Sequence, residues 1–150
     1  MFQSNELGVS VEASKFKVCI DNYVDGSIKG EFYNCYMEKP IDFYDSGSLV
    51  LRIDREMDRL KFPVQTNKTR SFFNLNTNTD EKISAVKYKD IKEFREGELA
   101  TFIFLVEARQ NSQWLCNVIE GGKVIKDYSC IYDLMYDIDN FCKDLLKKES

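Results

Sequence analysis

The stretch FYDSGSLVLRIDREMDRL, residues 43–60, has a near double late in the chain, YSCIYDLMYDIDNFCKDL, residues 128–145. Each stretch carries apolar residues at the three- and four-residue spacing of a helix that buries one face. In the first stretch these residues are Leu49, Ile53, Met57 and Leu60. In the second they are Ile131, Leu134, Ile138, Phe141, Cys142 and Leu145. Both stretches therefore predict amphipathic helices, the first capped by Asp45, Ser46 or Ser48 and the second by Ser129.

Three extended segments precede each predicted helix. Before the first helix they are KFKVCIDN (15–22), IKGEFYNCYM (28–37) and the short IDF (41–43), with a turn at Asp25 and Gly26. Before the second they are LATFIFLVEAR (99–109), QWLCNVIE (113–120) and KVIKDY (123–128), with a turn at Gly121 and Gly122. Alternating apolar residues between such turns are typical of strands joined as hairpins. The chain therefore predicts two βββα units.

The two units align in their strands as well as in their helices. The matched pairs are Phe16 with Phe102, Val18 with Phe104, Ile20 with Val106, Phe32 with Trp114, Phe43 with Tyr128 and Asp54 with Asp139. Two interpretations are open: a tandem duplication with pseudo-two-fold symmetry, or two units that share only the pattern of their architecture. Either one predicts an α+β fold of two layers, in which two helices cover one face of a mainly antiparallel sheet.

We expect one domain, because 150 residues are enough to bury a single core. Its repeat-like units cover about residues 15–61 and 100–147, and a basic insert rich in Asn and Thr, residues 62–98, joins them. An unstructured connection of that length is uncommon in a compact domain. Residues 83–88, ISAVKY, predict a further strand in the insert, followed by a polar connection that ends at Gly97.

The compartment is predicted from the cysteines and from the first residues. Five cysteines without CxxC spacing indicate neither a disulfide framework nor a zinc site, so we expect free thiols in a reducing compartment. The first fourteen residues lack the basic and apolar regions of a signal peptide, and no apolar run approaches the ~20 residues that span a bilayer. We therefore expect a cytoplasmic protein that makes no use of a membrane.

The composition of the chain disfavours catalysis. It contains no histidine, the side chain that most often transfers protons near neutral pH. It also contains no Walker A loop, no GxGxxG and no GxSxG motif. We expect a protein that is not an enzyme and that holds no cofactor and no metal. An enzyme that uses carboxylates or Tyr, Lys and Arg is the third hypothesis.

The first candidate binding site is the basic segment 59–79. It holds Arg59, Lys61, Lys68 and Arg70 and no acidic residue, whereas the other 17 basic and 25 acidic residues of the chain sum to minus eight. Cations beside Phe72 would suit a phosphate or a nucleic-acid strand on which bases stack. The other interpretation is that the aromatic residues pin the segment to the core while the cations stay in solvent. We favour this second interpretation.

The second candidate site is the turn RQNSQW, residues 109–114. Arg109, Asn111, Gln113 and Trp114 combine hydrogen-bond donors with an aromatic surface, as binding hot spots do. The structural interpretation, which we favour, is a hairpin turn with Asn111 at positive φ and Trp114 in the core.

Two carboxylate pairs form a third candidate. Asp54 and Asp58 lie four residues apart, as do Asp133 and Asp137, and such pairs can hold a divalent ion or share a proton. Since no third ligand lies nearby in the sequence, we favour solvated helix faces.

The hypothesis drawn from all these features is a small interaction or regulatory protein without catalytic activity, which binds another protein or self-associates. Its aromatic content of 13% suits a protein interface, where Tyr, Trp and Phe are enriched. The alternative is a binder of nucleic acid or of a phosphorylated small molecule through residues 59–79. The net charge of minus four argues against an extensive nucleic-acid interface.

Overall fold

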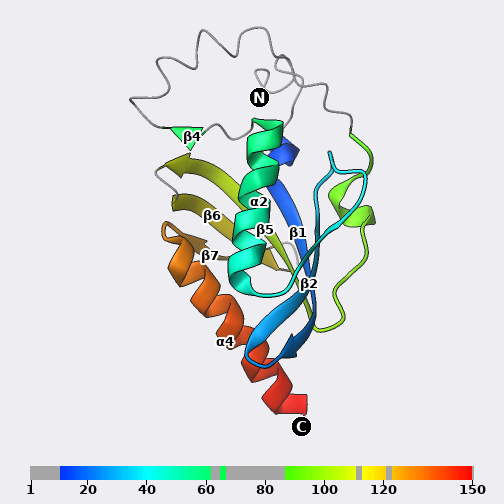
Figure 1. Cartoon of the computed structure of the whole chain (residues 1–150), viewed down its shortest axis with the longest axis vertical. Helices are drawn as coiled ribbons and strands as arrows, with labels where there is room; N and C mark the ends of the chain where they lie inside the picture. Colours follow the sequence, from blue (N-terminus) through cyan, green and yellow to red (C-terminus); the bar gives the residue numbers. More distant parts are fainter. Residues whose placement is uncertain (1–10, 62–64, 67–86, 111–112, 121–122, 150) are drawn as a thin grey trace, which may run out of the picture.

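The computed structural model describes residues 11–61, 65–66, 87–110, 113–120 and 123–149 (Figure 1). Its elements are η1 (Val11–Ser14), β1 (Lys15–Val24), β2 (Ser27–Tyr33), β3 (Ile41–Phe43), α2 (Ser46–Leu60), β4 (Gln65–Thr66), η2 (Ile91–Glu93), β5 (Ala100–Gln110), β6 (Gln113–Glu120), β7 (Lys123–Tyr128) and α4 (Ile131–Glu149). Neither helix in these ranges has the length and apolar character needed to cross a bilayer.

The sheet has the strand order β3-β2-β1-β5-β6-β7, and every neighbouring pair along it is antiparallel. The short β4 lies off this path and pairs in parallel with the end of β5. The first strands of the two predicted units, β1 and β5, are neighbours at the centre of the sheet, where Phe16 lies opposite Phe104. The predicted α+β class is confirmed. The tandem duplication stays a hypothesis that fits this symmetrical order.

Local sequence explains how the elements begin and end. The β1–β2 hairpin turns at Asp25 and Gly26, which have φ angles of 55° and 78°, as the predicted two-residue turn requires. Asp45 caps α2, because its Oδ1 accepts a hydrogen bond of 2.6 Å from the backbone N–H of Ser48. The Ser48 hydroxyl oxygen accepts in return from the backbone N–H of Asp45, which completes a capping box.

The start of α4 differs from the prediction by one residue. The helix begins at Ile131, and the Cys130 carbonyl accepts the first helical hydrogen bond from Leu134, so Ser129 lies outside the cap position. The backbone N–H of Ile131 donates instead to the side chain of Gln113 at 2.9 Å. A side chain from the start of β6 therefore satisfies an N–H group that the helix itself leaves unpaired.

One hydrophobic core lies between the sheet and the two helices. It contains, from the predicted set, Phe16, Phe102, Phe104, Val106, Leu49, Ile53, Met57, Leu134 and Ile138, together with Trp114 and Cys142. Leu145 was predicted to join this core, but it is only half-buried and lies outside the cluster. Near the end of α4 the helix therefore has less of the sheet beneath it.

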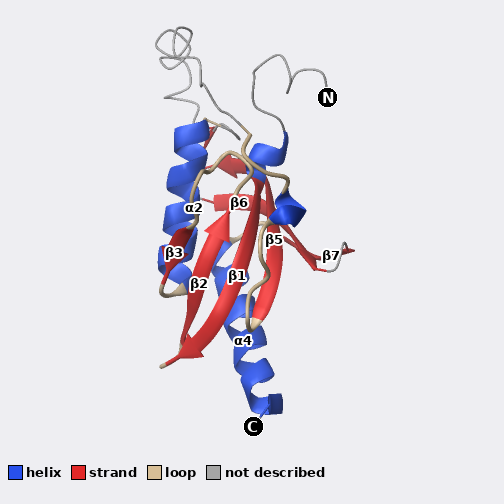
Figure 2. Ribbon diagram, turned by 90° about the vertical axis from the view of Figure 1, so that its right-hand side faces the viewer, coloured by secondary structure: helices blue, strands red, loops and turns tan. Residues whose placement is uncertain are grey.

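The other face of the sheet is crossed by the segment 87–99, which contains η2. In Figure 2 this segment lies on the opposite side of β1 from α2. Lys17, although 97% buried, donates from Nζ to the carbonyl of Phe94 at 2.8 Å, and Phe94 stacks on Tyr33. Of the strand predicted at 83–88, residues 83–86 lie outside the described part, and Lys87 and Tyr88 are not in a strand.

Candidate functional site

The predicted site residue Arg109 is buried between the end of β5 and α2, with only 2% of its side chain exposed. Its Nη1 donates to Asp58 Oδ1 at 2.8 Å and to Asp54 Oδ1 at 3.2 Å. Trp114 lies opposite Arg109 on β6, is buried, and donates from Nε1 to the same Asp54 oxygen at 3.2 Å. The pair Asp54 and Asp58 thus neutralises a cation of the sheet and fixes α2 to it.

The remaining predicted site residues lie near this end of the domain or outside the described residues. Lys61 is the left-handed C-cap of α2, with φ of 55°, and its backbone N–H donates to the carbonyl of Asp58. Gln113 caps α4, as described above. Lys68, Arg70, Phe72 and Asn111 lie outside the described residues. Every described member of the predicted set thus makes contacts that hold the fold together.

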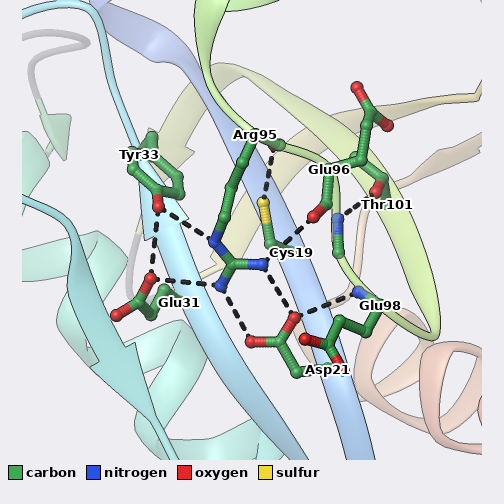
Figure 3. Close-up of polar contacts among 9 residues, drawn as sticks. Cys19, Asp21, Glu31, Tyr33, Arg95, Glu96, Glu98 and Thr101 are labelled. Carbon is green, nitrogen blue, oxygen red and sulfur yellow. Dashed lines mark hydrogen bonds and ion pairs between the residues drawn. The ribbon is translucent and has the colours of Figure 1, made fainter.

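A second polar cluster lies on the other face of the sheet, around Arg95 (Figure 3). Its guanidinium donates to both oxygens of Asp21, each at 2.8 Å, to Glu31 Oε1 at 3.1 Å and to the Tyr33 hydroxyl at 3.1 Å. A fifth bond goes to the carbonyl of Glu96 at 3.1 Å. A guanidinium has five N–H donors, so each of them has an acceptor within the protein.

The electrostatics of this cluster agree with a structural role. The hydrogen bonds from Arg95 hold the pKa of Asp21 below its usual value, and burial raises the pKa of the Cys19 thiol to about 11. The Arg95 cluster fastens the segment 87–99 to the sheet.

Outside this cluster, burial likewise raises the pKa values of Cys116 and Cys142 to about 12. These thiols are protonated at neutral pH and make poor nucleophiles.

One hollow of about 290 Å³ opens between the β2–β3 connection, α2 and Tyr88. Its charged residues, Glu38, Lys39, Glu56 and Arg59, balance one another. Arg59 donates from Nε to Glu56 at 2.9 Å and from Nη2 to the carbonyl of Tyr36 at 3.1 Å. The volume is just below the roughly 300 to 1,000 Å³ of small-molecule sites. The two acidic and two basic residues of the lining give the hollow no net charge that would attract an anion.

The outer surface of α4 carries large side chains that do not pack in the core. Tyr132 and Tyr136 are each 69% exposed, whereas Leu134 and Ile138 between and after them are buried. Positions 133, 141, 143, 144 and 147 of the helix are exposed as well, and position 140 is half-buried. One row of five positions along the helix follows at helical spacing. We call this set the α4 stripe: Tyr132, Tyr136, Asn140, Lys143 and Lys147.

The protein holds this helix in place through its flank. Asp137 accepts from Lys126 Nζ and from the Tyr128 hydroxyl of β7, each at 2.8 Å. The hydrogen bond from Lys126, followed by the one from Tyr128, lowers the pKa of Asp137. Asp137 of the second predicted carboxylate pair therefore forms an ion pair with Lys126 of β7. This contact holds α4, and with it the α4 stripe, against the sheet.

Asp139, two residues after Asp137, lies in an environment that raises the pKa of its carboxyl group instead of lowering it. Its Oδ2 accepts from the Ser46 hydroxyl at 3.4 Å, but its Oδ1 is buried without a hydrogen-bond partner in the described part of the chain. Burial, with a contribution from nearby Asp45, raises the pKa of Asp139. A carboxyl group that takes up a proton more readily in the folded state stabilises the fold below its unfolded pKa, and this stabilisation is lost as the pH rises through the folded pKa.

We therefore expect two neighbouring variants to show opposite pH dependence. Asp139→Asn should gain stability relative to the unmodified protein as the pH rises from about 4 to 7, because it removes the carboxylate that burial destabilises. Asp137→Asn should lose relative stability as the pH rises at the acid end, from about 2 to 5, because Asp137 ionises more readily in the folded state, where it holds Lys126 and Tyr128. Urea unfolding at several pH values measures both. If the relative stability of both variants changed with pH in the same direction, the environments assigned to Asp137 and Asp139 would be wrong.

Sequence reasoning did not select Tyr132, Tyr136 or Arg95 as site residues. The signal for the two tyrosines was their position two residues before and after Leu134, which places both on the face opposite the buried stripe. The partners of Arg95, at positions 21, 31 and 33, are separated from it by more than sixty residues, and no local sequence pattern predicts such contacts.

The described residues contain no group of three or more carboxylate or thiol side chains placed to hold a metal ion. Comparisons of the chain with models of protein families, with curated proteins and with solved structures gave no match.

Proposed function

We propose that this protein is a small interaction or regulatory module without catalytic activity, which binds another protein or self-associates through the α4 stripe. The observation that carries the proposal is the pair of tyrosines, Tyr132 and Tyr136, each 69% exposed one turn apart on a helix. Tyrosine contributes a large apolar surface with a polar tip, and it is enriched where proteins meet.

The polar clusters around Arg95 and Arg109 are less suited to bind a partner than the α4 stripe. The Arg95 guanidinium is fully hydrogen-bonded within the chain, and the Arg109 side chain is buried against two carboxylates. Both clusters stabilise the fold. The α4 stripe lies on a helix that the contacts of Asp137 with Lys126 and Tyr128 of β7 fix, so a partner would meet an ordered surface and would lose little entropy in ordering it.

We also propose that the protein acts in the cytoplasm. None of the five cysteines forms a disulfide in the structure, and Cys19, Cys35, Cys116 and Cys142 are buried. Five cysteines without a disulfide suit a compartment that keeps thiols reduced.

The test is photo-crosslinking in cells that express the chain. A photoreactive phenylalanine analogue is placed at Tyr132 in one variant and at Ala108, an exposed residue of β5, in the control. We expect a discrete covalent adduct from position 132 and much less from position 108. An adduct of twice the 17.5 kDa chain identifies self-association, and any other mass identifies a different protein. Equal or absent adducts at both positions would contradict the proposal.

The alternative, binding of nucleic acid or a phosphorylated small molecule through residues 59–79, draws less support. Arg59 at the start of that segment is engaged by Glu56 and Tyr36, and the nearby Arg109 is buried. The alternative predicts that changing Lys61, Lys68 and Arg70 together to glutamine abolishes retention on an anionic column at low salt while changing stability little. Unchanged retention would exclude it.

A further inference from the structure

The aromatic and the charged residues of the α4 stripe lie in different halves. Tyr132 and Tyr136 occupy the first half, and Lys143 and Lys147 occupy the second, with Asn140 between them. Both tyrosines and both lysines are exposed. At 100° per residue these five positions fall within a sector of about 80°, so they form one straight row along the outside of the helix.

This row is complementary to itself when a second copy is placed against it in the opposite direction. An antiparallel pair with its two-fold axis between positions 139 and 140 sets Tyr136 opposite Lys143 of the second copy, and Tyr132 opposite Lys147. The same contacts recur on the other side of the axis, as in an isologous interface. Asn140 of each copy lies next to the axis. A lysine ammonium over a tyrosine ring is an attractive cation–π contact.

We propose that the partner of the α4 stripe is a second copy of this chain, docked antiparallel through α4. This inference rests on the proposed function and names its partner. Complementarity argues for the second copy, since the tyrosines and the lysines lie at equal distances from one point of the helix.

The size of the contact sets its strength. A helix of 19 residues is roughly 28 Å long at 1.5 Å per residue. With a contact strip about 10 Å wide, each copy buries on the order of 300 Å², well below the roughly 800 Å² per partner of a standard interface. The dimer is therefore weak and reversible, and it forms when the protein is concentrated.

A charge exchange across the axis tests this geometry. Tyr136→Lys sets lysine against Lys143 of the second copy twice, and Lys143→Glu removes the two contacts between Tyr136 and Lys143 while leaving those between Tyr132 and Lys147. In a mixture of the two variants, the new lysine meets the new glutamate at one contact, and the native pair meets at the other. Sedimentation equilibrium from about 10 µM to about 1 mM should show each variant alone at least about fivefold weaker in self-association than the unmodified chain. The equimolar mixture should return to within about twofold of it.

The outcomes separate this inference from the proposed function. Circular dichroism and thermal unfolding of both variants show first that they fold, as changes at exposed positions allow. If the unmodified chain stays monomeric at the highest concentration, or if mixing restores nothing, the antiparallel dimer is wrong. A crosslink from position 132 to a different protein would then still support the interaction module. Absence of any crosslink from that position would overturn both.

Discussion

Ile138→Ala is expected to lower the free energy of unfolding by about 2 to 5 kcal/mol, as buried large-to-small changes do. Ile138 is 4% exposed and belongs to the core that α4 shares with α2 and the sheet. Its replacement removes apolar surface from that core and leaves a cavity which the close-packed neighbours can fill only in part. Chemical denaturation monitored by circular dichroism measures the loss.

Tyr136→Ala is the matched control, since it lies two residues earlier on the same helix and points outward. We expect it to change the free energy of unfolding by no more than about 0.5 kcal/mol. Equal losses in the two variants would mean that both faces of α4 are packed. A change near zero at Ile138 would mean that the helix docks elsewhere.

The second large effect is expected at the ion pairs of Arg109. Asp54→Ala combined with Asp58→Ala removes both carboxylates from a guanidinium that is 2% exposed, and it removes the acceptor of the Trp114 indole N–H. Loss of the carboxylates from a buried cation costs about 3 to 5 kcal/mol, because the charge cannot be hydrated in its place.

Arg109→Met separates the cost of the charge from the cost of the contact. The side chains of Asp54 and Asp58 are 31% and 59% exposed, so water can solvate them when the cation is gone. We expect this variant to remain within about 1 kcal/mol of the unmodified protein, and we expect the triple variant to recover most of the loss of the double variant. A triple variant as unstable as the double would show that the alanines act through packing and not through charge.

The sequence was informative wherever a contact is local. The helical spacing of Leu49, Ile53 and Met57 and the turn at Asp25 and Gly26 each depend on residues within a few positions of one another. Local pattern therefore predicted the sheet, both helices and the face that they cover. It was less accurate at Leu145, because where the sheet ends beneath a helix is a property of the whole fold.

The candidate site was much harder to predict. The composition of residues 109–114 suggests a binding turn, yet Arg109 and Trp114 point into the protein because Asp54, more than fifty residues earlier, lies against them. The exposure of Tyr132 and Tyr136 could be anticipated from the phase of the α4 pattern. Their importance could not, because an aromatic residue on a helix is equally compatible with a core contact until the other face is known to be buried.

The most direct test of the central claim is whether the tyrosines of α4 are covered in the cell. Tyrosine nitration, mapped by mass spectrometry, compares dilute purified protein with intact cells that express the chain at high concentration. Tyr44 and Tyr88, 54% and 52% exposed on other parts of the surface, are internal references. We predict that Tyr132 and Tyr136 are nitrated readily in the dilute protein and protected in the cells, while the references react equally in both. Equal nitration of Tyr132 and Tyr136 in the two samples would contradict the claim that a polypeptide partner covers the α4 stripe.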